Sequence, residues 1–235
     1  MRLPMHSVIV VLMTLTLGHT IATVAMSEPT AAELNEFQET KVKADAGDVS
    51  SQYKLAGLYS KGLGTTKDEA EAVRCYRQVA DQNDARGQSM LGVMYTNARG
   101  VPRDYEIALK WFRKAAAQNS AHAQYNLGHM YSTGKGVAQD DVQSAAWYRK
   151  AAEQNDLNSQ RILGTLYATG RGVPADLVQA HAWTKVSGSE SDMAALKQLQ
   201  QQLVKFESQM TADQILEAAK VAEEIATRMK SLKKR

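Results

Sequence analysis

Apolar side chains recur along most of the chain at the spacing of amphipathic helices, and the whole pattern repeats every 36 residues. In the third unit, one face of a first helix is formed by four positions at i, i+4, i+7 and i+8: Ala123, Leu127, Met130 and Tyr131. The second helix of that unit has helical spacing at Ser144, Trp147, Tyr148 and Ala151. This periodicity predicts a pair of amphipathic helices in each unit and no strands.

Several residue types recur in columns, that is, at positions 36 residues apart, without a gap. The columns are Tyr59, Tyr95, Tyr131 and Tyr167; Gly64, Gly100, Gly136 and Gly172; Gln52, Gln88, Gln124 and Gln160; and Cys75, Trp111, Trp147 and Trp183. One helical hairpin cannot bury its own apolar face, whereas stacked hairpins can. The sequence therefore predicts an all-α solenoid of about four repeats, with the tyrosine and tryptophan columns in its core.

Local patterns mark the ends of the predicted helices. In the third unit a glycine turn at 134–137 is followed by Asp140 as N-cap, and Gln143 is placed to complete a capping box. The N-cap column also contains Asp68, Asp104 and Asp176. Residues that tolerate the left-handed conformation stand where the preceding helices should end, at Gly47, Asn83, Asn119 and Asn155. Three glycines should let neighbouring helices approach closely: Gly92, Gly128 and Gly164.

The register divides the chain into a signal peptide at 1–25, a capping helix at 26–47 and four repeats over 48–188. The repeats are assigned to 48–83, 84–119, 120–155 and 156–191. Residues 192–235 lose the register but keep helical spacing, which predicts a C-terminal helical cap ending in a basic tail.

The N-terminal segment has the features of a secretory signal peptide. A positive Arg2 precedes an apolar run from Val8 to Leu17, and small residues precede a predicted cut after Ala25, with Ala22 as the alternative. The run is shorter than the roughly 20 residues that a membrane-spanning helix needs, although an uncleaved segment would anchor the protein. We expect the mature protein in the periplasm or outside the cell.

Repeats two to four carry a specific family pattern. The runs at 127–131 (LGHMY), 134–137 (GKGV) and 145–152 (AAWYRKAA) resemble the Sel1-like repeat, a relative of the tetratricopeptide repeat. The first repeat departs from the pattern at Ala56, Thr65 and Cys75. The resemblance covers about residues 48–188 and implies a right-handed α-solenoid with adaptor roles in bacterial envelope or host-facing processes. It implies no particular partner.

Motifs for catalysis, nucleotide binding and metal binding are not found in the sequence, so we expect no cofactor and no metal. His122 and His129 would lie about 10.5 Å apart along one helix, which is too far for a single metal ion. Cys75 is the one cysteine, and its place in the tryptophan column predicts a buried, inert thiol. A net charge of +3 gives little reason to expect nucleic-acid binding.

The face of the first helices opposite the packing stripe is the predicted binding surface, and by resemblance to tetratricopeptide repeats it lines a concave groove. Its twenty equivalent positions include no Asp or Glu. The candidate partner-binding residues are Tyr53, Lys61, Arg86, Asn97, His122, Tyr125, His129, Asn158 and Arg161. Unpaired cations there favour a protein or peptide with acidic segments. The second helices are expected to present a solvated outer face at Arg113, Lys114, Arg149 and Lys150.

These observations favour an extracytoplasmic adaptor that binds another protein in this groove. One alternative is an envelope-associated structural factor whose basic C-terminal tail contacts membrane or cell-wall polymer. The other is an enzyme, since cysteine-rich members of the Sel1-like family bind or hydrolyse β-lactams. Those members carry a cysteine pair in each repeat, and this sequence has none, so we expect no enzymatic activity.

Overall fold

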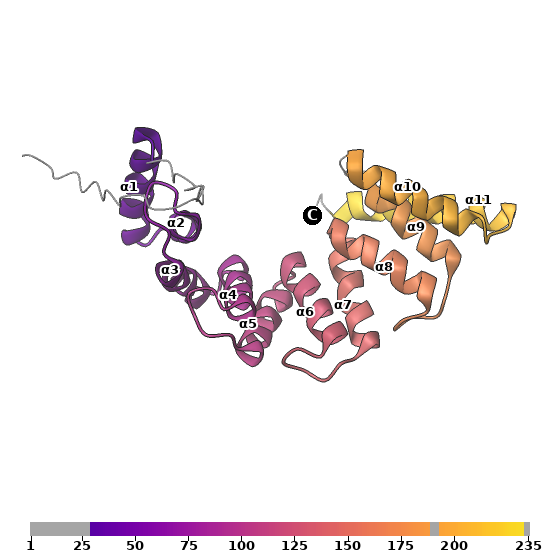
Figure 1. The fold of residues 1–235 in the computed structure, drawn as a ribbon, viewed down its shortest axis with the longest axis horizontal. Coiled ribbons are helices and arrows are strands. Elements are labelled where there is room, and N and C mark those ends of the chain that lie inside the picture. The colour runs from indigo at the N-terminus through magenta and orange to yellow at the C-terminus, as the bar shows by residue number, and fades with distance from the viewer. Residues whose placement is uncertain (1–28, 189–192, 233–235) are drawn as a thin grey trace, which may run out of the picture.

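The computed structural model describes residues 29–188 and 193–232, and the predicted signal peptide with its cleavage site lies outside them. The described residues form helices and connecting loops without a strand, which confirms the all-α prediction (Figure 1). The helices are α1 (Ala31–Asp45), α2 (Val49–Lys61), α3 (Glu69–Asp81), α4 (Ala85–Asn97), α5 (Tyr105–Ala117), α6 (Ala121–Thr133), α7 (Asp141–Glu153), α8 (Leu157–Thr169), α9 (Leu177–Ser187), α10 (Met193–Glu207) and α11 (Ala212–Leu232).

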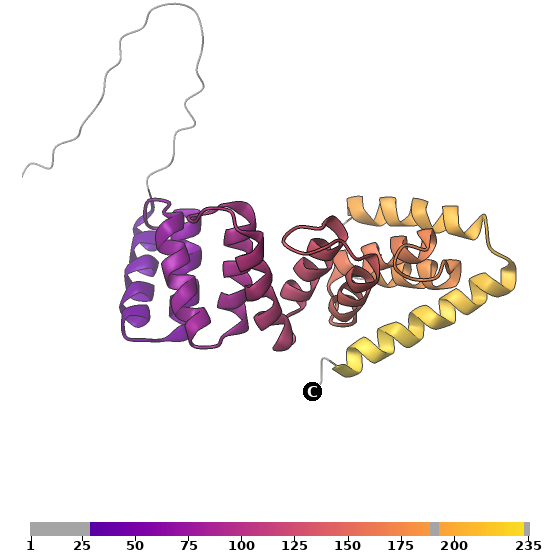
Figure 2. The same cartoon turned by 90° about the horizontal axis from the view of Figure 1, so that it is seen from below.

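Consecutive helices pack as four hairpins, α2/α3, α4/α5, α6/α7 and α8/α9, and each hairpin packs against the next. Figure 1 shows them following a curved path from α1 at one end to α10 and α11 at the other. At the first end α1 packs on α2, and at the other α10 and α11 both pack on α9 (Figure 2). Among the described helices, none combines the length and the apolar composition that crossing a bilayer requires.

The helix ends use the residues expected from the sequence. Four aspartates cap the second helices by accepting hydrogen bonds from first-turn backbone N–H groups: Asp68, Asp104, Asp140 and Asp176. The residues after α1, α3, α5 and α7 are left-handed, with positive φ at Gly47, Asn83, Asn119 and Asn155. The capping box predicted at Asp140 is only half formed, because Asp140 accepts the Gln143 N–H while, within the described residues, the Gln143 side chain makes no hydrogen bond back to Asp140. Reciprocal boxes form elsewhere, at Thr30 with Glu33 and at Thr211 with Gln214.

Two glycine columns permit close packing for different reasons. Gly100 has a φ of 66°, and a Cβ there would lie 2.1 Å from the carbonyl oxygen of Glu69 in the preceding repeat. Gly92 lies within a helix, where a Cβ would meet the ring of Phe112 at 2.6 Å. The predicted close approach of neighbouring helices is therefore confirmed at Gly92, and a Cβ at either glycine would clash with its neighbour.

The tryptophan column is only partly core, which corrects the sequence prediction. Cys75 and Trp183 are 1% and 2% exposed, whereas Trp111 and Trp147 are half-buried at the edge of the stack. Lys114 lies 4.6 Å from the centroid of the Trp111 ring, and Lys150 stands in the same relation to Trp147 at 4.1 Å. A half-buried indole face favours such a cation, so these lysines do more than solvate the outer face.

The tyrosine column also departs from the prediction, because Tyr95 and Tyr131 are half-buried. Arg77 donates to the Tyr95 hydroxyl at 2.7 Å, and Arg113 donates to the Tyr131 hydroxyl at 3.0 Å. Arg149 makes the same bond to Tyr167. A phenol hydroxyl needs a polar partner, so this column lies where an exposed arginine of one repeat reaches the tyrosine of the next.

Candidate functional site

The first helices α2, α4, α6 and α8 form a shared surface, here called the first-helix face. Arg86 of α4 lies 5.2 Å from the ring centroid of Tyr53 of α2. Ser89 of α4 lies with its Oγ 2.8 Å from Nδ1 of His122 in α6. Because side chains touch across two successive repeat boundaries, residues predicted from separate repeats belong to one surface.

The remaining predicted residues lie further along this face. Asn158 and Arg161 are both on α8 and hydrogen-bond to each other. Lys61 is exposed at the end of α2, and in the described part of the chain it has no hydrogen bond or ion pair. The structure thus brings the nine candidates together in groups, with Lys61 apart.

Arg86 is not an unpaired cation, and the prediction is wrong on this point. Its guanidinium forms an ion pair with the Asp84 carboxylate at 2.7 Å, and Asp84 also accepts the backbone N–H of Arg86 as the N-cap of α4. The side-chain hydrogen bond from Arg86 lowers the pKa of the Asp84 carboxyl. Asp84 precedes the first helix, so it lies outside the twenty positions that the sequence analysis compared.

A depression of about 390 Å³ opens between α4, α6 and the loops that follow them. It brings together three of the predicted residues, Asn97, Tyr125 and His129. The full lining is Thr96, Asn97, Arg103, Tyr105, Tyr125, Asn126, His129 and Lys135. Arg103, Tyr105 and Lys135 are not among the residues predicted from the sequence, because they lie outside the first helices, in the loops and at the start of α5.

The depression is electropositive. Arg103 and Lys135 lie 5.9 and 5.8 Å from the centroid of the same Tyr105 ring. No carboxylate lines the depression, and neither cation forms an ion pair within residues 29–188 and 193–232. Burial and then the nearby Lys135 charge lower the pKa of His129. At neutral pH this imidazole is therefore uncharged and can donate or accept one hydrogen bond.

The Ser89–His122 contact resembles the hydroxyl–imidazole pair of a nucleophilic enzyme, but its position does not support catalysis. Burial lowers the pKa of His122, which keeps the ring neutral. Ser89, however, is only 2% exposed, so a substrate has no access to its hydroxyl. The pair instead links α4 to α6.

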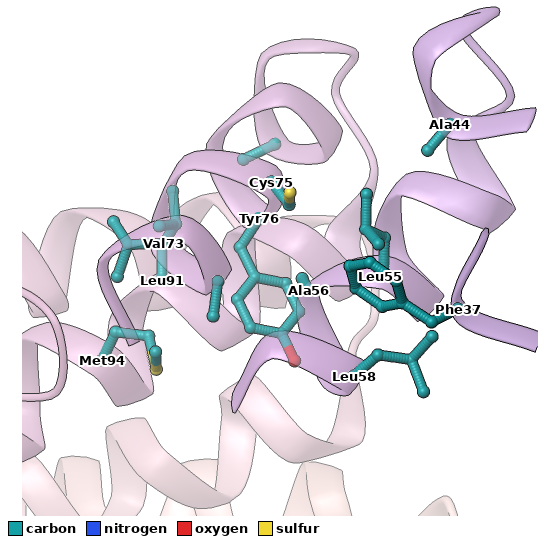
Figure 3. Packing of buried hydrophobic residues seen from close by; sticks show 12 residues of the cluster. Phe37, Ala44, Leu55, Ala56, Leu58, Val73, Cys75, Tyr76, Leu91 and Met94 are labelled. Atoms are coloured by element: carbon teal, nitrogen blue, oxygen red, sulfur yellow. The ribbon is translucent and has the colours of Figure 1, made fainter. Parts of the chain in front are cut away.

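Cys75 is buried as predicted, in the core cluster of the first repeats that also contains Tyr76 and Leu55 (Figure 3). Burial raises the pKa of its thiol, which disfavours the reactive thiolate. Over the described ranges, no three His, Cys, Asp or Glu residues are grouped so that they could hold a metal ion.

Two larger cavities lie near the C-terminal end, away from the first-helix face. One of about 690 Å³ lies between α9 and α11, but three of its charged groups, Arg149, Asp176 and Arg228, already have partners. Arg149 bonds Tyr167, Asp176 caps α9, and Arg228 lies 3.6 Å from Glu153. The other, about 740 Å³, is an apolar groove between α9 and α10 that includes Leu196 and Leu203. Of the three, the smaller depression is the one lined by predicted partner-binding residues, namely Asn97, Tyr125 and His129.

The repeat pattern is matched by a known family profile. The Sel1 repeat family matches residues 49–84, 85–120, 121–156 and 157–188. The chain belongs to the Sel1 repeat family. Its fold commonly mediates protein–protein interaction, and proteins with Sel1 repeats are typically non-catalytic scaffolds.

Solved structures of Sel1-repeat proteins resemble this chain closely. One is c5321, a protective antigen present in uropathogenic Escherichia coli strains, at 34% identity and a TM-score of 0.75 over 83% of this chain and 41% of that one. Another is a Sel1 repeat protein from Oxalobacter formigenes, at 31% identity and a TM-score of 0.64 over 72% of this chain and 49% of that one. This chain therefore spans less than half the length of either relative. Among curated proteins no sequence matches it.

Proposed function

We propose that this Sel1-repeat protein is an extracytoplasmic adaptor that binds an acidic segment of another protein along the first-helix face. The observation that carries the proposal is the depression between α4 and α6. It combines two cations without counter-ions, amide side chains and tyrosine rings, and no carboxylate lines it. These groups suit a peptide with acidic side chains, because charge-assisted hydrogen bonds to carboxylates are among the stronger polar contacts.

The aromatic residues of the face support a binding role because they are held in place before a partner arrives. Tyr53 packs edge-on against Tyr76 with ring centroids 5.5 Å apart, and Tyr125 packs against Tyr148 at 5.8 Å. Tyr53 and Tyr125 are half-buried, so each ring is anchored on one side and open on the other. Rigid aromatic side chains add contact area at a low entropic cost, as at other protein interfaces.

The charge of the face is mild, and we therefore expect a modest affinity. Asp84 neutralises Arg86, which leaves Lys61, Arg161 and the two cations of the depression to attract an anionic segment. Four repeats offer a small surface, and micromolar binding is the expectation for an interface of that size.

Affinity capture from the native cell envelope tests this proposal. The bait is the mature chain, compared with Lys61→Glu/Arg161→Glu on the face and with Lys110→Glu/Lys185→Glu as a charge-matched control. Lys110 and Lys185 are exposed on second helices and make no ion pair in the described part of the chain. Arg113 and Arg149 are unsuitable as controls because they bond tyrosines of the next repeat.

A protein captured by the wild type and by the control, but lost with the face variant, supports the proposal. A protein lost with the control and kept with the face variant places the partner on the second helices and refutes it. The location is tested separately by N-terminal sequencing, which should find a start near Met26 in an extracytoplasmic fraction. An intact Met1 in the cytoplasmic fraction would contradict export.

A further inference from the structure

In the first repeat, a carboxylate is held between two cations from neighbouring loops. Glu69, the first residue of α3, accepts a hydrogen bond from Arg99 at 2.9 Å and lies 3.1 Å from Nζ of Lys67. Partial burial opposes ionisation, but the hydrogen bonds from Arg99 and Lys67 outweigh it and lower the pKa of the Glu69 carboxyl. The arrangement joins the first repeat to the loop of the second.

The same contact recurs between the third and fourth repeats. Asp141 is the first residue of α7, and its Oδ1 lies 2.8 Å from Nη2 of Arg171 as an ion pair. Asp141 stands in the column of Glu69, and Arg171 stands in the column of Arg99. The Arg171 guanidinium beside it lowers the pKa of the Asp141 carboxyl. A loop cation on an acidic first residue is thus a recurring link between repeats.

Between the second and third repeats the cations remain, but the acid is missing. In this repeat, Tyr105 occupies the column of Glu69 and Asp141. Lys135 occupies the column of Arg99 and Arg171, so a cation is present there as well. Arg103 likewise occupies the column of Lys67. Both cations lie against the Tyr105 ring in place of a carboxylate. The adjacent Asp104 does not replace the acid, because it caps α5 by accepting the Ile107 N–H.

We propose that Arg103 and Lys135 form a subsite for a carboxylate that the bound partner supplies. The carboxylate would stand in for the acidic residue that the first and third repeats provide themselves. The proposal rests on the proposed function only for the identity of the molecule that carries this carboxylate, an acidic peptide segment.

The surroundings of the two cations suit this ligand. The depression of about 390 Å³ has room for an acidic side chain, with Tyr125 in its wall. The side chains of Asn97 and His129 also line it, and within the described residues neither has a hydrogen bond. Each can donate to a carboxylate held between Arg103 and Lys135. The chain therefore offers up to four donor groups from two adjacent repeats.

Replacing Tyr105 separates this subsite from the rest of the face. Tyr105→Glu would restore the intramolecular acid and fill the subsite, whereas Tyr105→Phe keeps the ring and serves as its control. Full-length mature protein is titrated with N-acetylated hexaglutamate, and with hexaglutamine at the same ionic strength, while backbone amide NMR shifts are followed. We expect hexaglutamate alone to shift the amides around Asn97, Arg103 and Lys135.

Tyr105→Phe should bind hexaglutamate within about twofold of the wild type, and Tyr105→Glu about tenfold or more weakly, the effect of losing a charged hydrogen bond. Equal binding by Tyr105→Glu, or equal shifts with hexaglutamine, would overturn the subsite. If Tyr105→Glu does not fold, Arg103→Gln/Lys135→Gln must show the same loss.

The outcomes also distinguish the subsite from the proposed function. Shifts confined to the surroundings of Lys61, Arg86 and Arg161 would refute the subsite and leave an acidic partner on the first-helix face. If amide shifts occur at the depression but the native partner binds the face variant as well as the wild type, the subsite is supported and the proposed function is refuted.

Discussion

Gln118 donates a hydrogen bond from its Nε2 to Oε1 of Gln88, 2.8 Å away within the second repeat. The bond recurs from Gln82 to Gln52 at 2.7 Å and from Gln154 to Gln124 at 2.7 Å. The acceptors are buried, and Gln88 also donates to Asn83 at 3.0 Å. This ladder of amides joins the two helices within each of the first three repeats, and the bond from Gln88 to Asn83 links the second repeat to the first, in addition to their apolar contacts.

Gln88→Leu should destabilise the protein by about 1–3 kcal/mol, because it removes the hydrogen-bond partner of Gln118 and Asn83 within the stack. Urea unfolding measures the loss. Gln143→Leu on the exposed side of α7 is the matched control and should stay within about 0.5 kcal/mol of the wild type. An equal effect of both variants would show that the ladder does not stabilise the stack.

Ala98→Gly should stabilise the protein by about 0.5–1 kcal/mol. Ala98 closes α4 with a φ of 56°, a left-handed conformation that costs a residue with a Cβ, whereas glycine closes α2, α6 and α8. The reverse change, Gly134→Ala, should destabilise by a similar amount, since its Cβ would have room at 3.5 Å and only backbone strain opposes it. Thermal unfolding of both variants checks the opposite signs.

Cys75 should react slowly with a thiol reagent in the folded protein, because the side chain is buried and burial raises its pKa. Labelling should accelerate to the rate of a free thiol in urea. Cys75→Ala should leave partner binding unchanged, since the residue lies in the core and away from the first-helix face. Rapid labelling of the native state would contradict the assignment of an inert thiol.

Stability should decrease as the pH falls below about 6.5, the ordinary pKa of histidine. Burial, followed by Lys135, lowers the pKa of His129 in the folded state, so the unfolded chain binds this proton more readily and gains population on acidification. His129→Gln should therefore lose less stability between pH 7 and pH 5 than the wild type does. Urea midpoints at the two pH values decide this, and identical losses would contradict it.

Much of the fold could be predicted from the sequence because a few residue columns determine the helix ends and the close helix contacts in every repeat. Aspartate caps, left-handed asparagines and close-packed glycines each act within one turn or one helix contact, so their positions suffice to predict them. The half-buried positions of Tyr131 and Trp147 could not be predicted in this way, because they depend on side chains from other columns. Tyr131 contacts Arg113, and Trp147 contacts Lys150.

The candidate site was predicted only in part for the same reason. Asn97, Tyr125 and His129 share a helix face and were found from helical spacing alone. The pairing of Arg86 with Asp84 depends on the side-chain conformation of an N-cap residue. The contact of Lys135 with Tyr105 joins residues of two repeats. Neither relationship follows from comparing first helices, although the missing acid at Tyr105 is visible in its column.

The central claim is that a partner binds the first-helix face through its cations. The dissociation constant of the captured partner, measured by calorimetry against wild type, Lys61→Glu/Arg161→Glu and Lys110→Glu/Lys185→Glu, tests this most directly. The account predicts a loss of about 1–3 kcal/mol for each charged hydrogen bond removed on the face, and little change for the control. Unchanged affinity in the face variant, with weaker binding in the control, would contradict it.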